Sequence, residues 1–430
     1  METRKMTASP LQSSELEHSS QTRRYRQCCK LSLQSFLEKI GFKVILGEEE
    51  FTSKFYVDLT WDYFGSNRET IYRRMNQLIA EATQEYLVNN QEDILKLTDN
   101  LMDNFCSPLA AYTVSRIVVG KENYKNPTLL KTFLDFDNDA KIAMGKADIM
   151  PFPTSRDSKL EAHYKTIYDI LRPTIMERRK SGSYQSDGDG DLLSFIMRRV
   201  NDDVHVARLV GIMVWGGLTN LCLSLTHLLT DIAFQKDAQA HIWSSIKNED
   251  VATLYDIDSN EKNSNSPWAL LTSVMLESLR LATNMAGPSR LVIDADQPLC
   301  SFANNSVVKV KRGEAFTFCP YFVHRDESNW AQAKSFLPHR FLKSPCPAGQ
   351  TNFLSWGISN HVCPGRFFAA NYLRVVVKEV LSKHRLSLIA AEKEEDASSY
   401  RYVNGQAFRC PGKIRFASRL IEQVEISSKL

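Results

Sequence analysis

The stretch from Leu209 to Leu229 (LVGIMVWGGLTNLCLSLTHLL) is the longest weakly charged run in the chain, and it constrains the fold more than any other feature. It is long enough to cross a bilayer. However, it lies in the middle of the chain and contains an adjacent pair of glycines, Gly216 and Gly217, and several polar side chains, which lipid tolerates poorly. We therefore predict a single buried helix from Val206 to about Phe234. A helix that is apolar on most sides must be surrounded by other elements.

The composition is that of a globular protein with a sizeable core. The chain has 430 residues, 43% of them hydrophobic, and a formal net charge of +3. These values exclude an intrinsically disordered chain and give no electrostatic case for binding nucleic acid. The 9 cysteines are odd in number and scattered, without a CxxC pair. This pattern favours a reducing compartment over a disulfide framework or a zinc ribbon.

The pattern along the chain indicates a mainly α protein with a small β component. Residues 1–45 are predicted to be a poorly structured lead without a signal peptide. Helical periodicity covers Glu69–Leu87 and Glu92–Val118, whereas Arg290–Ile293 resembles a short strand. From Pro320 to Cys363 the chain shows little periodicity, and so long an irregular stretch usually serves a function.

A cysteine stands at the end of this irregular stretch, in the segment WGISNHVCPGRFF. Trp356 and Gly357 open a turn-rich loop that leads to Cys363, and Pro364-Gly365 then precede a helix. Amide groups and the dipole of a helix N-terminus stabilise a thiolate there. A lone thiolate suits an axial haem ligand. A buried structural cysteine explains the loop equally well.

Charged residues stand in an otherwise apolar helix (ALLTSVMLESLRLAT). Glu277 and Arg280 are three residues apart and share a helical face. If this face is buried, the pair needs a further hydrogen-bonding partner. Arg340, in the segment FLPHRF, is the candidate. The alternative is an exposed pair that contributes little to stability.

Taken together, these motifs resemble those of the cytochrome P450 family. ExxR (Glu277 to Arg280), HRD (324–326), PxRF (338–341) and Cys-x-Gly (363–365) occur in the family's order at plausible spacings. The resemblance runs from about residue 50 to the C-terminus. It implies the P450 fold, mainly α with small β-sheets. A catalytic domain is then expected over residues 46–430, with a haem-ligand loop at 353–366. The chain begins after most of the family's membrane helix, proline hinge and β1 strands, so the presence of the first β1 strands is left open.

The resemblance also implies roles for individual residues. Cys363 is the expected thiolate ligand of the haem iron, within a loop that also contains Gly357 and Gly365. Glu277, Arg280 and Arg340 are expected to form a buried ion cluster, and Arg290 to contact a haem propionate. The loop departs from the family pattern because Trp356 and His361 replace a phenylalanine and an arginine. We expect Trp356 to pack beside the sulfur, and His361 to bind a propionate less firmly than an arginine would.

The long helix departs from the family pattern at the distal haem face. The family has Ala/Gly-Gly-x-Asp/Glu-Thr, and this chain has Trp-Gly-Gly-Leu-Thr-Asn at 215–220. Thr219 or Asn220 takes the threonine position, depending on the register, and both registers lose the acid. Both residues are candidate catalytic groups. The run also resembles the WAxxxN pattern of the prostacyclin synthase and bile-acid hydroxylase branches, so it does not separate isomerisation from hydroxylation.

The function implied by the resemblance is a haem-thiolate monooxygenase that oxidises a hydrophobic small molecule, in the style of fungal secondary-metabolite biosynthesis. Its expected partners are O₂ and an NADPH-cytochrome P450 reductase, so that NADPH acts only indirectly. Three alternatives remain: a P450-fold isomerase or dehydratase that needs neither O₂ nor reductase, a shortened non-catalytic relative, and a helical scaffold with an inert Cys363. The family sits on the cytosolic face of the endoplasmic reticulum. We recognise no anchor in this chain, which leaves peripheral membrane contact or a cytosolic location.

Overall fold

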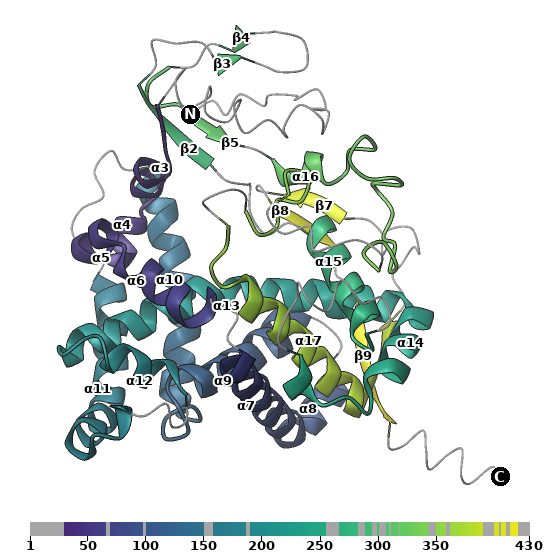
Figure 1. Cartoon of the computed structure of the whole chain (residues 1–430), viewed down its shortest axis with the longest axis horizontal. Helices are drawn as coiled ribbons and strands as arrows, with labels where there is room; N and C mark the ends of the chain where they lie inside the picture. The colour runs from purple at the N-terminus through teal and green to yellow at the C-terminus, as the bar shows by residue number, and fades with distance from the viewer. Residues whose placement is uncertain are drawn as a thin grey trace.

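The computed structural model describes most of the chain between residues 30 and 419. It covers residues 30–65, 69–97, 100–149, 158–185, 190–254, 266–282, 289–294, 299–300, 307–308, 311–317, 319–342, 350–357, 362–389, 400–403, 406–409 and 413–419. Within them the protein is mainly α-helical with small antiparallel sheets, as predicted (Figure 1).

The helices make up most of the molecule. In chain order they are α3 (Leu33–Lys39), α4 (Phe42–Leu46), α5 (Glu48–Ser53), α6 (Phe55–Thr60), η1 (Trp61–Gly65), α7 (Glu69–Asn89), α8 (Gln91–Lys96), η2 (Met102–Cys106), α9 (Ser107–Val118), α10 (Pro127–Ile149), α11 (Ser158–Ser181), η3 (Ser183–Gln185), α12 (Leu192–Met197), α13 (Asp203–Phe234), α14 (Lys236–Ile246), η4 (Val251–Thr253), α15 (Ala269–Leu281), α16 (Pro320–Val323) and α17 (Arg366–Lys383).

The strands form small sheets at the edge of the helical body (Figure 1). They are β1 (Lys30–Ser32), β2 (Ser289–Asp294), β3 (Leu299–Cys300), β4 (Val307–Val308), β5 (Ala315–Thr317), β6 (His384–Ile389), β7 (Tyr400–Val403), β8 (Gln406–Arg409) and β9 (Lys413–Ser418). One sheet has the order β1-β2-β5, and the pairs β3-β4, β6-β9 and β7-β8 form the others, all antiparallel.

Helix α13 is the centre of the fold. It has 32 residues, which corresponds to about 48 Å, and it crosses the middle of the molecule (Figure 1). The Asp202 carboxylate caps its first turn by accepting from the Val204 amide at 3.0 Å. α9, α10, α11, α15 and α17 pack around it. Among the described helices, α13 alone is long and apolar enough to cross a membrane. Since 61% of its most apolar window is buried inside the protein, it is the predicted core helix.

The start of the described chain differs from the predicted lead. Residues 30–45, assigned to that lead, include β1, α3 and most of α4. β1 is ordered by pairing with β2, where Leu31 lies opposite Val292, more than two hundred residues away in sequence. The Ser32 hydroxyl then caps α3 by accepting from the Ser35 amide. Residues 1–29 lie outside the described residues.

The continuous helix predicted over Glu92–Val118 is wrong. This segment contains α8, then η2 and α9, separated by an interruption after Leu97. Leu97 has an extended backbone, and Asn100 has a φ of 43°, the left-handed region that a helix interior does not use. Asn100 then bonds the Asp103 side chain and amide, which starts the next helical segment.

Candidate functional site

The loop that leads to Cys363 is held by its own backbone. The Gly357 amide donates to the Leu354 carbonyl at 3.0 Å, closing a turn in which Gly357 has a φ of +76°. Glycine adopts this conformation without steric cost. The Cys363 amide donates to the Trp356 carbonyl at 2.7 Å, and α17 begins three residues later. Cys363 is therefore presented at the N-terminal end of a core helix.

The Cys363 thiol is partly buried at the rim of the main hydrophobic core. Burial raises its pKa, and the Gly365 amide and the Arg366 guanidinium oppose that rise. The protein by itself therefore keeps the sulfur as a thiol, and the amide and the cation are the groups that favour a thiolate. Of the atoms in the described part of the chain, a side-chain carbon placed on Gly365 would meet only this sulfur, at 4.0 Å, so the described residues leave space beside the sulfur.

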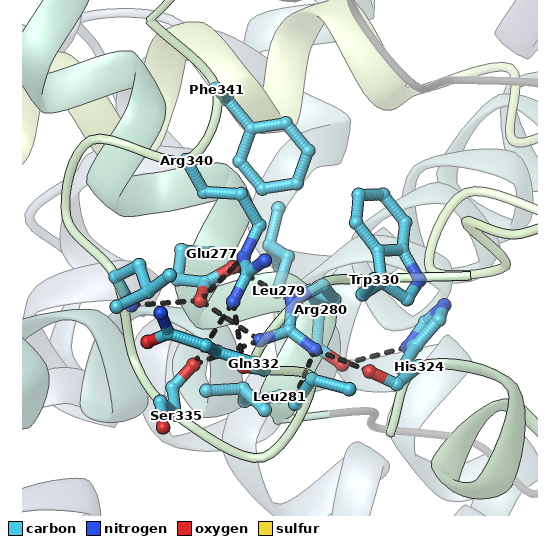
Figure 2. Close-up of polar contacts among 12 residues, drawn as sticks. Glu277, Leu279, Arg280, Leu281, His324, Trp330, Gln332, Ser335, Arg340 and Phe341 are labelled. Atoms are coloured by element: carbon cyan, nitrogen blue, oxygen red, sulfur yellow. Dashed lines mark hydrogen bonds and ion pairs between the residues drawn. The ribbon is translucent and has the colours of Figure 1, made fainter. Parts of the chain in front are cut away.

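The structure brings Glu277, Arg280 and Arg340 together in a buried ion cluster (Figure 2). Arg280 donates to the Glu277 carboxylate at 2.7 and 2.9 Å. Arg340 donates to both oxygens of the same carboxylate at 3.0 Å. Side-chain exposure is 0% for Glu277 and Arg280 and 9% for Arg340. The exposed-pair alternative is therefore wrong.

The second positive charge in the cluster is compensated by backbone carbonyls. Arg280 donates to the carbonyls of Ala333 and Ser335, at 2.6 and 3.1 Å. Arg340 donates to those of Ala331 and Gln332, at 2.6 and 3.0 Å. A segment without regular secondary structure is thus wrapped around two guanidinium groups (Figure 2). The cluster fixes this segment against α15.

His324 links this cluster to the cysteine loop. Its Nδ1 hydrogen-bonds the Arg280 carbonyl at 2.7 Å, and its Nε2 accepts from the Leu354 amide at 2.8 Å. Because Leu354 can only donate here, His324 carries its proton on Nδ1. Burial lowers the pKa of this imidazole to about 3, so it remains neutral at physiological pH. The Ser355 hydroxyl adds a bond to the Leu279 carbonyl of α15.

The middle of α13 has an open face. Gly216 and Asn220 are exposed although the flanking segments, residues 206–212 and 221–233, are mostly buried. Among the residues that the structure describes, a side-chain carbon added to Gly216 or Gly217 would meet nothing within 4 Å. These glycines are therefore not explained by close helix packing. They leave space beside a core helix, which is where a bound group can enter.

Thr219 and Asn220 point in different directions. The Thr219 hydroxyl donates to the Asp137 carboxylate of α10, so it lies on the side of α13 that faces α10. Asn220 lies on the open face with Gly216, and its side-chain amide donates to the Gly216 carbonyl at 3.3 Å. Of the two registers considered from the sequence, this orientation favours the one with Asn220 at the threonine position and Thr219 at the acid position.

Arg290 lies on β2 and is partly buried. Within the described part of the chain its guanidinium donates to the Ser289 carbonyl at 2.8 Å and forms no ion pair. Desolvation lowers the pKa of Arg290, because burial disfavours the charged guanidinium. A nearby anion would offset this cost. Trp356 is buried, and its indole N–H has no partner among the described residues. His361 lies outside the described residues.

Comparison with known proteins identifies the family. The family model for cytochrome P450 matches residues 63–403, and the chain therefore belongs to the cytochrome P450 family. It is 22% identical over 331 residues to the cytochrome P450 monooxygenase avaL of Aspergillus versicolor, covering 66% of this chain and 58% of that protein. It is 23% identical over 310 residues to the cytochrome P450 monooxygenase paxP of Penicillium paxilli, with the same coverage of 66% and 58%.

A shorter match is to a mammalian enzyme. The chain is 31% identical over 133 residues to the 5-beta-cholestane-3-alpha,7-alpha-diol 12-alpha-hydroxylase of Sus scrofa, covering 28% of this chain and 26% of that protein. The chain thus spans at most 58% of the length of these relatives.

Family membership implies a haem-thiolate iron cofactor, and the residues present fit one. Cys363 offers the single sulfur donor, with open space beside it. Arg290 is a desolvated cation suited to a carboxylate. The open face of α13 carries two glycines and no charged side chain between Arg208 and Asp231.

Sequence reasoning missed two residues of this region. His324 was included in a family motif, but its bond to the cysteine loop was not expected. Its burial in the irregular segment gives no periodic signal. Asp137 was not considered, because α10 resembles an ordinary amphipathic helix in which an Asp four residues before a Lys forms a surface pair.

Proposed function

We propose that this chain is a haem-thiolate monooxygenase with Cys363 as the ligand of the haem iron. The observation that supports this most directly is the presentation of Cys363 on a braced loop at the start of α17. α17 packs against α13, whose middle is open. The proposed catalytic domain is residues 46–430, with the ligand loop at 353–366.

We propose roles for the surrounding residues from their burial, their contacts and, for His361, its place in the loop sequence. Arg290 holds a haem propionate, since it is a partly buried cation without an acidic partner in the described chain. Trp356 packs beside the sulfur and excludes water from it. Gly357 shapes the turn, and Gly365 keeps the sulfur face open. His361, in the same loop, is the second propionate ligand.

When bound, the cofactor supplies one-electron and oxygen chemistry that amino-acid side chains lack. The chain contributes the rest of the site. Cys363 provides the sulfur donor, and His324 together with the Glu277 cluster holds the loop that presents it. Asn220 faces the open side of α13, where its amide can bind a polar group of the substrate or O₂. The wall of α13 is otherwise apolar there, which suits a hydrophobic small molecule.

The substrate class and partners rest on the relatives. Both fungal relatives bear the name of cytochrome P450 monooxygenases. We infer a hydrophobic product of secondary metabolism as substrate, O₂ as oxidant and an NADPH-cytochrome P450 reductase as the electron donor. We also infer a position at the cytosolic face of the endoplasmic reticulum.

The test is the reduced carbon-monoxide difference spectrum of the haem-loaded protein. We expect a red-shifted Soret band in the wild type and its loss in Cys363→Ala. Cys319→Ala is the matched control, because Cys319 is also partly buried but lies outside the ligand loop. Equal spectra in wild type and Cys363→Ala contradict the assignment of the ligand. Absence of haem uptake in all three proteins instead favours a non-catalytic relative.

One observation favours a second candidate, a P450-fold isomerase or dehydratase. The open face of α13 presents Asn220 where the family has a threonine, and no acid lies beside it on the helix. The two functions differ in their requirements. Product formation that needs O₂ and NADPH supports the monooxygenase, whereas conversion of an organic peroxide without reductase supports the isomerase.

A further inference from the structure

The middle of α13 has no carboxylate of its own. The only acids on this helix are Asp203 in its first turn and Asp231 near its end. Asp231 is about 18 Å from Thr219 along the helix axis. A group that exchanges protons at the open face must therefore come from a different element.

Asp137 of α10 occupies that position. It accepts a hydrogen bond from the Thr219 hydroxyl, across the seam between the two helices. Other threonines of α13 behave differently: Thr226 and Thr230 each donate to the carbonyl four residues earlier, at 2.7 Å. That local bond is the ordinary choice for a threonine within a helix. The Thr219 hydroxyl instead donates to the Asp137 carboxylate of the neighbouring helix.

The other side of the Asp137 carboxylate reaches the surface. Its second oxygen pairs with the Lys141 ammonium at 2.7 Å, and side-chain exposure is 14% for Asp137 and 45% for Lys141. Thr219 is half-buried and lies beside Gly216 around the helix, on the side away from Asn220. Lys141, Asp137 and Thr219 thus form a continuous polar connection from solvent to the edge of the open face.

We propose that Asp137 is the acid of the distal site, acting through the Thr219 hydroxyl. This inference rests on the proposed monooxygenase function, in which two protons and two electrons are consumed as one oxygen atom enters the substrate and the other leaves as water. In the relay, Asp137 takes a proton from solvent, the Thr219 hydroxyl turns from donor to acceptor, and as its oxygen receives that proton it releases its own toward the open face. Asp137 then regains a proton from water at the surface. Asp137 is a positioning and relay residue, because it does not itself reach the open face.

The test uses the haem-loaded protein with a P450 reductase and NADPH. The variants are Asp137→Asn, which keeps the shape but cannot relay a proton, and Thr219→Val, which removes the hydroxyl. The matched controls are Asp135→Asn and Thr219→Ser. Asp135 is on the same helix and pairs with Lys131 at 2.5 Å, as Asp137 pairs with Lys141, and its side chain is 44% exposed.

We expect Asp137→Asn and Thr219→Val to oxidise NADPH about tenfold more slowly than wild type and to show a larger solvent deuterium isotope effect on that rate, because proton delivery then limits it. The double variant should be no worse than either single variant, because both changes interrupt one connection. A readout independent of turnover is the C–O stretching band of the reduced carbon-monoxide complex. It should shift in both variants and stay in place in both controls.

The outcomes are separable. If the wild type lacks the red-shifted Soret band, the proposed function and this inference both fail. If that band is normal and Asp137→Asn matches Asp135→Asn in isotope effect and C–O frequency, only this inference is overturned. If Asp137→Asn does not retain haem, Thr219→Val becomes the deciding variant, since it leaves the Asp137–Lys141 pair in place. A wild-type isotope effect and C–O frequency in Thr219→Val then overturn the inference.

Discussion

At the scale of the residue, the Glu277 cluster shows how a buried charge becomes a structural element. One carboxylate faces two guanidinium groups, and the surplus charge is met by carbonyls of an otherwise irregular segment. Such a cluster is weak evidence for stability as a whole, but breaking it from one side leaves charges buried without a partner.

Glu277→Gln tests this directly. The amide is nearly isosteric but leaves Arg280 and Arg340 facing each other without an anion, so we expect the free energy of unfolding to fall by about 3–5 kcal/mol. Urea denaturation followed by circular dichroism measures it. The control is Glu92→Gln, whose side chain is 89% exposed and pairs with Lys96 four residues on. That change should cost less than about 0.5 kcal/mol. Similar losses in the two variants would contradict this account of the cluster.

A second residue-scale prediction concerns His324. Replacement by leucine removes the acceptor for the Leu354 amide and the donor to the Arg280 carbonyl, both fully buried. We expect the reduced carbon-monoxide spectrum of His324→Leu to lose much of its red-shifted band, because the loop that presents Cys363 is released. His324→Gln can make both bonds and should recover part of it. Equal spectra for the two variants would show that the hydrogen bonds of His324 do not affect how the loop presents Cys363.

At the scale of the element, α13 combines two kinds of glycine. Gly211 is packed, since a side-chain carbon there would come within 3.0 Å of Tyr164 and 3.1 Å of Ile167. At Gly216 such a carbon would have nothing within 4 Å in the described parts of the chain. A glycine inside a helix costs about 1 kcal/mol relative to alanine. Close packing explains the glycine at position 211, whereas packing against the described residues does not explain the glycine at position 216.

Gly216→Ala and Gly211→Ala should therefore differ in their effect on the free energy of unfolding. We expect Gly216→Ala to raise the free energy of unfolding of the haem-free protein by up to about 1 kcal/mol. Gly211→Ala should gain less than this, or lose, because Tyr164 is held by its hydroxyl bond to the Ile45 carbonyl. Denaturant midpoints compare the two. The same Gly216→Ala variant should hold haem less tightly, as measured by transfer of haem to apomyoglobin. Unchanged haem retention would mean that the open face does not receive the cofactor.

At the scale of the whole molecule, buried neutral histidines make stability depend on pH. Burial lowers the pKa of His324 to about 3 and that of His384 to about 4, from an ordinary value of 6.5. Below pH 6.5 the unfolded chain binds protons that the folded protein does not. With respect to these two histidines, the folded protein is therefore most stable above pH 6.5. Its free energy of unfolding falls as the pH is lowered, toward pH 4 for His384 and toward pH 3 for His324.

We expect the free energy of unfolding to fall between pH 6.5 and 4 by up to about 3 kcal/mol for each histidine. Urea midpoints across this range measure the slope. His384→Gln should remove its share of the slope without touching the cysteine loop, because His384 lies at the start of β6, beyond α17. A wild-type slope in that variant would assign the pH dependence to other groups.

The motifs near the cysteine could be recognised from the sequence because each is local. The spacing of Glu277 and Arg280 follows from the helical repeat, and a cysteine before a Pro-Gly pair marks a helix start. Arg340 could be named as a further partner from its motif, but the backbone partners of these residues could not be predicted in the same way. The two guanidinium groups are satisfied largely by carbonyls of residues 331–335, and a carbonyl carries no sequence signal.

The sequence by itself determined that the chain has a long buried helix, a turn-rich cysteine loop before a helix, and the motif order of the cytochrome P450 family. Periodicity, turn residues and spacing are properties of neighbouring residues, so they can be read along the chain. Only the tertiary structure decided that Thr219 turns toward Asp137, 82 residues away, while Asn220 takes the open face. That choice depends on how α10 and α13 are rotated against each other, which is set by the packing of both helices together and not by the residues of either one.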